Sequence, residues 1–434
     1  MPGGLVIAAP ASGSGKTTMT LALLRLLARE GRRVAPFKTG PDYIDGAFHC
    51  AASAGRPCYN LDAFAMRRDT IAANLATGTQ DAELAIIEGV MGLFDGAANG
   101  TGSTADLAAM LDLPVILVID AARQSQSVAA LAHGFRSLRN DVTVAGVILN
   151  RVASARHEAL LRAALQQIDM PVLAALPAQE DLTLPSRHLG LVQAIERNNL
   201  DLFLDTAADW LHRHLDRALL EPLFRPLQLQ AGAALRPLPP LGQRIAVARD
   251  AAFAFAYPHL LQGWRAQGAA LSFFSPLQDE APAQDCDAIF LPGGYPELHA
   301  GKLAGNATML QGLRAAALRN AAIYGECGGF MLLGRSLTDA DGHEHAMAGL
   351  LPVTTSFRAR KRQLGYRRIT ALADTPLGAK GSRFRGHEFH YSAQIGDNIQ
   401  PLFDAGDALG AGLGPTGCRQ GGVFGSYLHL IDRE

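Results

Sequence analysis

The sequence predicts an α/β protein built from two domains. In both halves of the chain, short apolar runs with the character of buried strands alternate with amphipathic helices, a pattern typical of mostly parallel sheets. A chain of 434 residues is too long for one average domain. Prolines interrupt it repeatedly between residues 221 and 243. We therefore expect a domain at 1–220, a linker at 221–243 and a second domain at 244–434.

Composition excludes several classes of protein. The chain has 39 Lys and Arg against 40 Asp and Glu, and this balance gives no overall attraction to nucleic acid or to an anionic membrane. No apolar run approaches the roughly 20 residues that span a bilayer, and the first residues lack the charged region of a signal peptide. The five cysteines are scattered and form no C-x-x-C pair, which favours a reducing compartment. We expect a soluble cytoplasmic protein that binds neither nucleic acid nor membrane.

The chain begins with an apolar strand, a loop of small residues and an amphipathic helix, in that order, over residues 5–30. Gly13 and Gly15 allow the loop to turn its N–H groups inward, where the helix N-terminus adds a positive dipole end. Lys16 would then reach the β- and γ-phosphates, and Thr17 would hold Mg2+. The match to G-x-x-x-x-G-K-[ST] is incomplete, because proline replaces the first glycine. The order of elements still predicts a nucleoside triphosphate site.

Two further strands, expected at 34–38 and 84–87, end in polar groups. A turn follows the first of them and contains Lys38 and two aspartates, a combination suited to binding a metal and an anion; Asp45 is the second of these carboxylates. Glu88 directly follows the other strand. A carboxylate at the carboxyl end of a strand beside a phosphate-binding loop is where a Mg2+ ligand belongs.

The alternation continues through the rest of the first half. Strands are expected at Pro114–Asp120, Val142–Leu149 and Pro171–Leu176, with helices at Gln124–Leu138 and Leu202–Leu220. Asn150 ends one of these strands, and its amide either reads an adenine edge or simply terminates the strand. Strands alternating with helices predict a doubly wound parallel sheet that binds its ligands at the carboxyl ends of the strands.

The second half restarts the pattern, with strands expected at Arg244–Ala248, Ala269–Ser275, Ala288–Leu291 and Ala321–Tyr324. A Pro-Gly-Gly turn at 292–294 follows the third strand and exposes N–H groups, as an oxyanion hole requires. The fourth strand runs into Gly-Glu-Cys-Gly-Gly and a short helix, the cysteine form of a nucleophile elbow. Cys327 would lie at a helix N-terminus, where we expect the dipole to lower the pKa of the thiol.

A thiolate nucleophile needs a general base, and two groups of histidines are candidates. His387 and His390 form one group and His429 the other, each expected at a strand end, and spacing does not choose between them. The first pair also resembles a metal pair, but no third ligand follows at a useful spacing. The basic segment Arg358–Arg368 is either a solvated surface or a contact for a polycarboxylate substrate.

Together and in order, these motifs resemble the cobyrinic acid a,c-diamide synthase family of corrinoid biosynthesis. The resemblance covers nearly the whole chain and rests on APASGSGKTT, KTGPDYID, EGVMGLFDG, STADLA, PGGYPEL, YGECGGFMLLG, GHEFHYS and GSYLHL. It implies an N-terminal synthetase domain similar to dethiobiotin synthetase, with a P-loop fold, followed by a class I glutamine amidotransferase domain.

The resemblance also implies roles for individual residues. The nucleotide-binding residues would be Gly13, Ser14, Gly15, Lys16, Thr17, Thr18, Lys38 and Asn150, with Thr17, Asp45 and Glu88 as Mg2+ ligands. Cys327 would be the nucleophile that attacks glutamine, His429 its general base, and Gly293, Gly294 and Gly328 the oxyanion hole. Asp42 and Tyr43 are candidates for substrate contacts.

One departure from the wider amidotransferase pattern concerns the general base. Many class I enzymes carry a glutamate two residues after the histidine, where this chain has Ile431. We therefore expect a Cys–His dyad, with Glu388 as an alternative group to orient the imidazole.

The implied reaction is amidation of the a and c carboxylates of hydrogenobyrinic acid, with ATP and Mg2+ activating each carboxylate and glutamine supplying ammonia. The alternatives are the same reaction on cobyrinic acid, the related cobyric acid synthase, the amidase of nickel-sirohydrochlorin, and a P-loop scaffold ATPase with an inactive amidotransferase-like module. The oligomeric state stays open, with a homodimer as one alternative.

Overall fold

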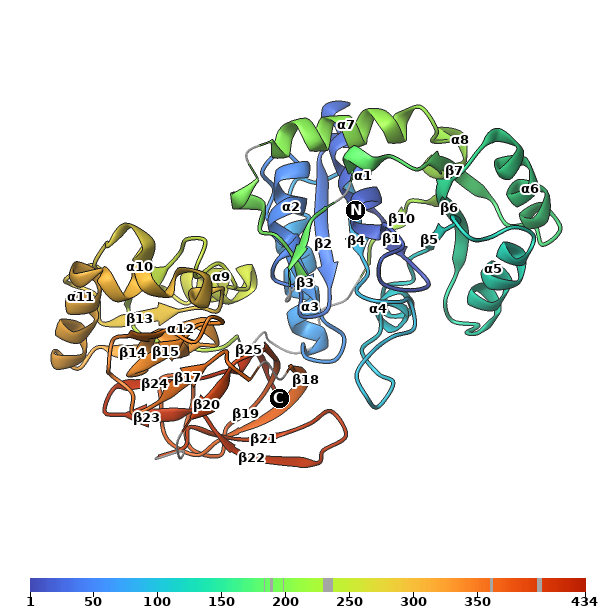
Figure 1. Ribbon diagram of the computed structural model, residues 1–434. Helices are drawn as coiled ribbons and strands as arrows, with labels where there is room; N and C mark the ends of the chain where they lie inside the picture. The colour runs from blue at the N-terminus through green and yellow to red at the C-terminus, as the bar shows by residue number, and fades with distance from the viewer. Residues whose placement is uncertain (183, 188–189, 198, 229–236, 360–361, 396–399) are drawn as a thin grey trace. The chain divides into compact units, whose positions relative to one another are not determined.

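The computed structural model describes residues 1–182, 184–187, 190–197, 199–228, 237–359, 362–395 and 400–434, and the chain forms two compact units (Figure 1). Unit 1 comprises Met1–Phe64 and Arg68–Leu235, and unit 2 comprises Ala65–Arg67 and Arg236–Glu434. Within the expected linker, residues 229–236 lie outside the described residues. None of the helices in the described residues has the length and apolar content needed to cross a membrane.

Unit 1 is organised around one sheet with the strand order β3-β2-β4-β1-β5-β6-β7. Along this path each strand is parallel to its neighbours, and β10 adds a short antiparallel pairing with β1. The strands of the sheet are β1 (Gly3–Ala8), β2 (Val34–Thr39), β3 (Tyr59–Leu61), β4 (Leu84–Glu88), β5 (Val115–Asp120), β6 (Val144–Val152), β7 (Val172–Pro177) and β10 (Arg225–Pro226). A separate hairpin joins β8 (Ser186–Arg187) to β9 (Gly190–Leu191).

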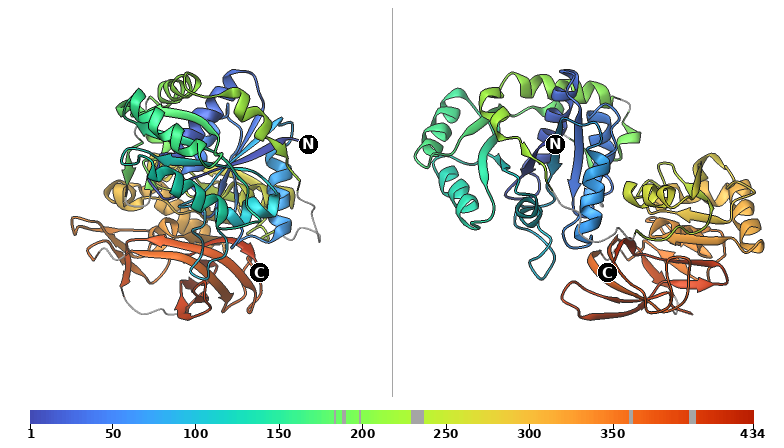
Figure 2. Two further views of the ribbon diagram at one scale, coloured as in Figure 1. Left: turned by 90° about the vertical axis from the view of Figure 1, so that its right-hand side faces the viewer. Right: turned by 180° about the vertical axis from the view of Figure 1, so that it is seen from behind.

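Helices cover both faces of this sheet (Figure 2). Right-handed crossovers put α1 and α2 on one face and α3 to α6 on the other, which explains why β4 and the apolar part of β5 are buried. The helices are α1 (Lys16–Arg29), α2 (Asp45–Ala52), α3 (Arg68–Gly78), α4 (Thr104–Leu111), α5 (Ser127–Ser137), α6 (Ala155–Gln166), α7 (Leu200–His212) and α8 (Arg217–Leu220), with 3-10 turns η1 (Glu180–Leu182), η2 (Ala194–Glu196) and η3 (Glu221–Leu223).

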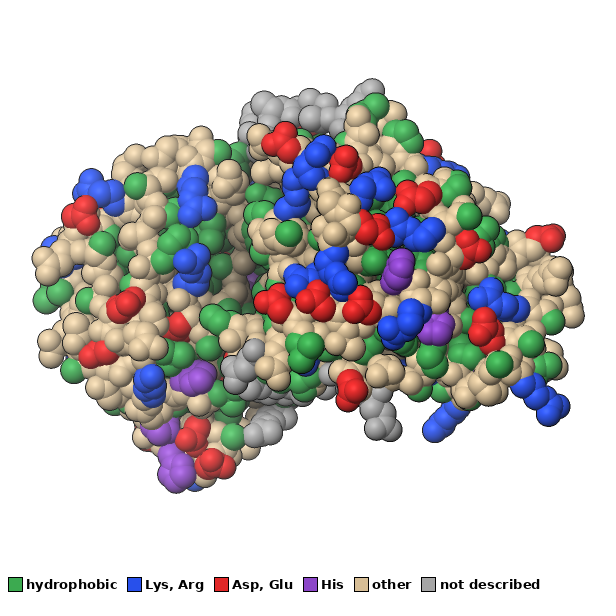
Figure 3. Space-filling model, turned by 90° about the horizontal axis from the view of Figure 1, so that it is seen from above, with side chains coloured by type: hydrophobic (Ala, Val, Ile, Leu, Met, Phe, Trp, Pro, Cys, Tyr) green, Lys and Arg blue, Asp and Glu red, His purple; other side chains and the backbone are tan. Residues whose placement is uncertain are grey.

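The surface carries mixed charge. On the face drawn in Figure 3, basic and acidic side chains lie beside one another rather than in separate fields. Ion pairs of this kind join α1 to α7, where Arg25 contacts Asp205 and Arg29 contacts Asp209, each at 2.8 Å. This distribution agrees with the near-zero net charge of the chain.

Strand register decides which side chains meet at the carboxyl edge of the first sheet. Ile7 in β1 and Lys38 in β2 both pair with Glu88, on opposite sides of β4. The loop that follows β1, the end of β2 and the end of β4 are therefore neighbours, because parallel strands end at the same edge.

Unit 2 contains a six-stranded sheet of order β12-β11-β13-β14-β24-β23, parallel except for β23. Its strands are β11 (Arg244–Ala248), β12 (Ala270–Phe274), β13 (Ala288–Leu291), β14 (Ala322–Glu326), β23 (Cys418–Gln420) and β24 (Val423–Ser426). Its helices are α9 (Pro258–Ala266), α10 (Ala300–Gly305), α11 (Ala307–Leu318) and α12 (Gly328–Leu333), with 3-10 turns η4 (Pro276–Gln278) and η5 (Pro296–His299).

Two smaller sheets complete unit 2. One has the order β16-β15-β17-β20 and consists of β15 (Ser336–Thr338), β16 (Glu344–Ala346), β17 (Thr354–Ser356) and β20 (Ala393–Ile395). The other is antiparallel, has the order β22-β21-β18-β19-β25, and consists of β18 (Gln363–Ala371), β19 (Arg383–His390), β21 (Phe403–Gly406), β22 (Gly412–Thr416) and β25 (His429–Arg433).

The α/β class is confirmed. Most expected strands and helices are present within a few residues of their predicted bounds, but the helix expected at Leu202–Leu220 is divided into α7, which ends at His212, and α8, which begins at Arg217. Three further local expectations differ. Asn150 lies inside β6, which continues to Val152. His387 lies inside β19 rather than at a strand end. Within the expected linker, Arg225–Pro226 forms β10 and pairs with β1, because the first two residues of β1 extend beyond the start of β5 and leave a partner position open.

Candidate active sites

The phosphate-binding loop lies between β1 and α1 in the conformation that its glycines permit. Gly13 and Gly15 have φ of 84° and 92°, in the left-handed region where a Cβ is strained. A Cβ on Gly15 would also lie 2.2 Å from Nδ2 of Asn150. That same Nδ2 donates a hydrogen bond to the carbonyl oxygen of Ser14 at 3.0 Å. Asn150 therefore holds the loop in place, a contact that the sequence did not reveal, and its contact with adenine stays a prediction.

Behind the loop, the expected Mg2+ ligands converge. The Thr17 hydroxyl donates to Oε1 of Glu88 at 2.6 Å and lies 3.5 Å from Oδ2 of Asp45. The buried ammonium of Lys38 donates to the same two oxygens, at 2.6 Å for Asp45 and 2.8 Å for Glu88. The structure thus brings together Thr17, Lys38, Asp45 and Glu88, and the first and last of these are 71 residues apart in the sequence.

The charges in this cluster balance one another. Burial opposes ionisation of Glu88, but Lys38 and His49 outweigh it and hold the pKa of the carboxyl well below its usual value. Burial likewise opposes the charge on Lys38, yet Asp45 and Glu88 hold the pKa of its ammonium well above the usual value. Burial and the neighbouring Lys38 lower the pKa of Lys16. Burial and the charge of Asp42 raise the pKa of Asp45 to about 6.

His49 is a member of the cluster that the sequence argument missed. Its Nδ1 donates to the carbonyl oxygen of Asp45 at 2.6 Å, and its Nε2 lies 2.6 Å from Oε2 of Glu88. Burial works against protonation of His49, but Glu88 outweighs it and raises the pKa. The signal was its position four residues after Asp45 on a helix, which places both on one face.

The donor set fits Mg2+. This ion takes oxygen ligands and is usually held through one or two carboxylates together with phosphate oxygens. Thr17, Asp45 and Glu88 supply one hydroxyl and two carboxylates in one place. The ammonium of Lys38 donates to both of these carboxylates, which shows that a positive charge is favoured between Asp45 and Glu88.

The two candidate substrate residues lie in the turn before α2. Oδ1 of Asp42 accepts the N–H groups of Ile44 and Asp45, both at 3.0 Å, and Oδ2 lies 3.5 Å from the Lys38 ammonium. Tyr43 is half-buried beside it. Asp42 therefore organises the turn, and the substrate role of both residues stays a prediction.

In unit 2, the sharp turn at Cys327 has the conformation of a nucleophile elbow. Cys327 has φ 46° and ψ −104°, and its N–H donates to the carbonyl oxygen of Ser426 at 2.8 Å. Its neighbours must be small, because a Cβ on Gly329 would lie 2.0 Å from the carbonyl oxygen of Leu291. The structure holds the cysteine in a backbone conformation that costs energy, as nucleophile sites often do.

The expected oxyanion-hole glycines lie together. A hydrogen bond fixes the loop at 292–294, because the carbonyl oxygen of Gly293 accepts the N–H of Phe255 at 3.0 Å. A Cβ on Gly328 would lie 3.0 Å from the backbone nitrogen of Gly294. A Cβ on Gly294 would lie 1.9 Å from the carbonyl oxygen of Ala252, so this position also requires glycine. The N–H groups of the loop and of the elbow are therefore neighbours, as an oxyanion hole needs.

Cys327 and His429 face the same point beside Gly293. A Cβ placed on that glycine would lie 3.2 Å from Cβ of Cys327, and 2.4 and 3.0 Å from Cε1 and Nε2 of His429. The absence of a side chain at Gly293 leaves room for the imidazole. His429 thus shares the space beside Gly293 with Cys327.

The expected lowering of the thiol pKa is wrong for this state of the protein. Burial, and then the charge of Glu297, raise the pKa of the Cys327 thiol, while the N–H of Gly328 acts in the opposite direction. The helix that begins at the elbow has only six residues, so its dipole is small. Burial lowers the pKa of His429 to about 3, so the imidazole is neutral in this state.

The other histidine group is engaged elsewhere. His387 is the cross-strand neighbour of His429. Nε2 of His390 lies 2.8 Å from Oε1 of Glu388, whose other oxygen accepts a hydrogen bond from Arg367 at 2.7 Å. Both oxygens of Glu388 therefore have partners other than His429, while its charge acts to raise the pKa of His429, so its role in orienting the imidazole stays a prediction.

The basic segment divides into two parts. Arg360 and Lys361 lie outside the described residues, and Arg358 and Arg362 are exposed. Arg367 is buried in β18, because its guanidinium pairs with Glu388 on β19. This arginine is not part of a solvated face.

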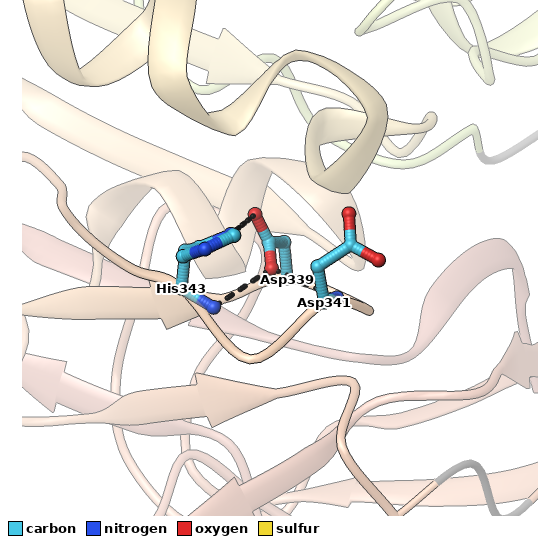
Figure 4. A group of neighbouring side chains, drawn as sticks. All are labelled: Asp339, Asp341 and His343. Atoms are coloured by element: carbon cyan, nitrogen blue, oxygen red, sulfur yellow. Dashed lines mark hydrogen bonds and ion pairs between the residues drawn. The ribbon is translucent and has the colours of Figure 1, made fainter.

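A third group of ligand-type side chains, Asp339, Asp341 and His343, lies at the turn between β15 and β16 (Figure 4). Oδ1 of Asp339 accepts the N–H groups of Asp341 and His343 at 3.0 and 2.9 Å, and Oδ2 lies 2.8 Å from Nε2 of His345. These contacts are those of a carboxylate that closes a turn, and we assign no ion to them.

Comparisons with known proteins identify the families to which the two halves of the chain are similar. Residues 5–192 match the family described as the CobQ/CobB/MinD/ParA nucleotide binding domain, and residues 244–434 match the CobB/CobQ-like glutamine amidotransferase domain. A curated relative from Brucella anthropi, named hydrogenobyrinate a,c-diamide synthase, is 55% identical over 99% of this chain and 98% of its own length. Relatives of the same name from Rhizobium meliloti and Rhodobacter capsulatus are 54% and 51% identical, each over 99% of both chains. The chain therefore belongs to the hydrogenobyrinate a,c-diamide synthase family, in which a nucleotide-binding domain precedes a glutamine amidotransferase domain.

Proposed function

We propose that this protein is a carbon–nitrogen ligase that converts the a and c carboxylates of hydrogenobyrinic acid into amides, using ATP and glutamine in cobalamin biosynthesis. The observation that carries the proposal is that one chain holds both a complete phosphate-loop cluster and a complete nucleophile elbow with its histidine. Full-length relatives that bear the synthase name support the choice of substrate. We place the reaction in the cytoplasm, and the five free cysteines are consistent with a reducing compartment.

In the first site, the chain activates the carboxylate. The N–H groups of the phosphate loop and the Lys16 ammonium hold the phosphates of ATP, and Thr17, Asp45 and Glu88 would hold Mg2+, which supplies charge neutralisation at the phosphates. Transfer of the γ-phosphoryl group to a substrate carboxylate gives an acyl phosphate and ADP. The carboxylate oxygen, a poor leaving group, thereby becomes part of phosphate.

In the second site, the chain releases ammonia. His429 takes the proton of the Cys327 thiol as the sulfur attacks the glutamine amide carbon, and the N–H groups of the glycine loop stabilise the oxyanion. The C–N bond breaks, His429 returns the proton to the leaving nitrogen, and a thioester remains. Water then hydrolyses the thioester to glutamate. Ammonia displaces phosphate from the acyl phosphate to give the amide, and two rounds consume two ATP and two glutamine.

The experiment that tests the function is mass spectrometry of the product formed with ATP, Mg2+ and glutamine from hydrogenobyrinic acid, cobyrinic acid or nickel-sirohydrochlorin. We expect conversion of two carboxylates to amides on hydrogenobyrinic acid. Conversion only of the cobalt or nickel compound would replace the substrate in this proposal. Reaction of none of them would leave the scaffold ATPase as the better interpretation.

Gly293→Ala provides a test of the second site. The new Cβ would overlap Cε1 of His429, so the imidazole must move away from the sulfur. Misplacement of a catalytic group by about 1 Å can reduce the rate about 100-fold. We expect a loss of this size in glutamate release from glutamine, with amidation from added ammonia unchanged. Gly305→Ala is the control, because nothing lies within 4 Å of its Cβ position. Equal rates for the two variants would contradict the placement of His429.

A further inference from the structure

A buried carboxylate lies behind the catalytic imidazole, and it comes from the residue before the nucleophile. Oε2 of Glu326 lies 3.7 Å from Nδ1 of His429, and both side chains are almost completely buried. Nε2, the other ring nitrogen, lies 3.0 Å from the Cβ position of Gly293, and Cβ of Cys327 lies 3.2 Å from the same point. The chain thus places a carboxylate beside one ring nitrogen of His429 and the elbow near the other, although Ile431 occupies the position where many class I enzymes carry a glutamate.

The orientation of this carboxylate is set by two donors on its other oxygen. Oε1 of Glu326 accepts the N–H of Leu430 at 3.0 Å and the hydroxyl of Tyr324 at 2.9 Å. The ring of Tyr324 is stacked between Phe290 and Phe424, with centroid distances of 5.8 and 5.2 Å, on the two strands that flank β14. With Oε1 held in this way, Oε2 is the oxygen directed to the imidazole.

We propose that Glu326 is the positioning residue of the glutamine-hydrolysing site, and that a small approach of its Oε2, from 3.7 Å to hydrogen-bond distance, lets it accept the Nδ1–H of His429. When Glu326 is ionised, this contact keeps Nε2 free of a proton, as a general base requires, and it stabilises the imidazolium that forms when Cys327 gives up its proton. The inference rests on the proposed roles of Cys327 and His429 in glutamine hydrolysis.

The electrostatics of the pair set a condition on this role, because Oε2 accepts the Nδ1–H only when the carboxyl of Glu326 is ionised. Burial raises the pKa of Glu326 to about 8, although the Leu430 N–H and the Tyr324 hydroxyl act against the shift. A carboxyl with this pKa is mostly protonated at neutral pH. Two neutral donors hold its ionised form, and a positive charge arriving on His429 favours that form. Burial, followed by the charge of Glu326, holds the pKa of Tyr324 well above its usual value, so the phenol remains a donor.

Glu326→Gln is the informative substitution, because the backbone decides how the amide is oriented. The Leu430 N–H and the Tyr324 hydroxyl require an acceptor at the Oε1 position, so the amide nitrogen must occupy the Oε2 position. There it would donate to Nδ1 and put the proton of His429 on Nε2, the wrong tautomer for a base. We expect kcat for glutamate release to fall at least about 100-fold with KM nearly unchanged, and Glu326→Asp to recover part of the loss.

Amidation from added ammonia, with ATP, is the test of folding, and we expect Glu326→Gln to retain it within about twofold, since the first site is untouched. Glu344→Gln makes the same change at an exposed position of unit 2 and should leave glutamate release unchanged. Cys327→Ala tests the underlying proposal separately: if it still releases glutamate, the role of the elbow is wrong, whatever Glu326 does.

Two outcomes would overturn the inference. One is a kcat for Glu326→Gln within about threefold of the wild-type value; the other is a large loss in Glu388→Gln without one in Glu326→Gln. If Glu326→Gln also loses the ammonia reaction, Tyr324→Phe decides, because it removes one donor from Oε1 and leaves the carboxylate in place. We then expect a severalfold lower kcat for glutamate release with the ammonia reaction intact, and an unchanged kcat would refute the proposal.

Discussion

Replacement of Cys327 with alanine is expected to abolish glutamine-dependent amidation while leaving ammonia-dependent amidation intact. The sulfur is the only atom of that side chain that can form the thioester, and loss of a nucleophile of this kind reduces kcat by about 10^4-fold or more. The ammonia reaction needs only the first site, whose residues all lie in unit 1. Both activities are measured by mass spectrometry of the corrinoid product, with glutamate release assayed in parallel.

Cys286→Ala is the matched control for this experiment. Cys286 is also buried in unit 2, but it precedes β13, at the opposite end of that strand from the glycine loop. Its loss should cost some stability and leave glutamate release unchanged. If Cys327→Ala retained glutamine-dependent amidation, or if both cysteine variants lost it equally, the elbow would not be the site of glutamine attack.

Replacement of Lys16 with methionine is expected to abolish amidation from both nitrogen sources. Lys16 is the first residue of α1, and its ammonium lies in the buried cluster, 3.9 Å from Oε1 of Glu88. Methionine keeps much of the side-chain length without the charge. Removing one preorganised group that stabilises transition-state charge costs about 10^2- to 10^3-fold in rate. The assay is ATP-dependent amidation with saturating ammonia, so that the second site does not limit the rate.

Lys302→Met, an exposed lysine on α10 of unit 2, is the control and should amidate at the wild-type rate. The two catalytic variants then separate the sites, since Cys327→Ala loses only the glutamine reaction and Lys16→Met loses both. A Lys16→Met protein that amidates normally with ammonia would remove the phosphate loop from the mechanism.

The features predicted from the sequence share a local cause. The loop between β1 and α1 and the elbow at Cys327 depend on glycines within a few residues, because their backbone conformations admit little else. The convergence of Asp45 and Glu88 with Thr17 was a prediction about residues far apart in the sequence. It rested on the rule that a parallel sheet binds its ligands at the carboxyl ends of its strands. The roles of these residues in catalysis remain predictions for the variants above to test.

Other features depend on packing between distant parts of the chain. His49, Asn150 and Arg367 each have polar partners that only the strand order and the helix positions bring near. The prediction that the pKa of the Cys327 thiol is lowered was wrong for the same reason. A local pattern shows where a helix starts but not how deeply the sulfur is buried.

The sequence by itself determined the α/β class, the family and the motifs of the two candidate sites, because glycine turns, apolar runs and the polar residues that end them are local and ordered along the chain. Only the tertiary structure placed a carboxylate beside the imidazole of His429. Glu326 and His429 lie on β14 and β25, in different sheets, and their approach depends on how those sheets pack rather than on spacing along the chain. Burial and long-range electrostatics are properties of that packing, and they set the protonation states on which the chemistry depends.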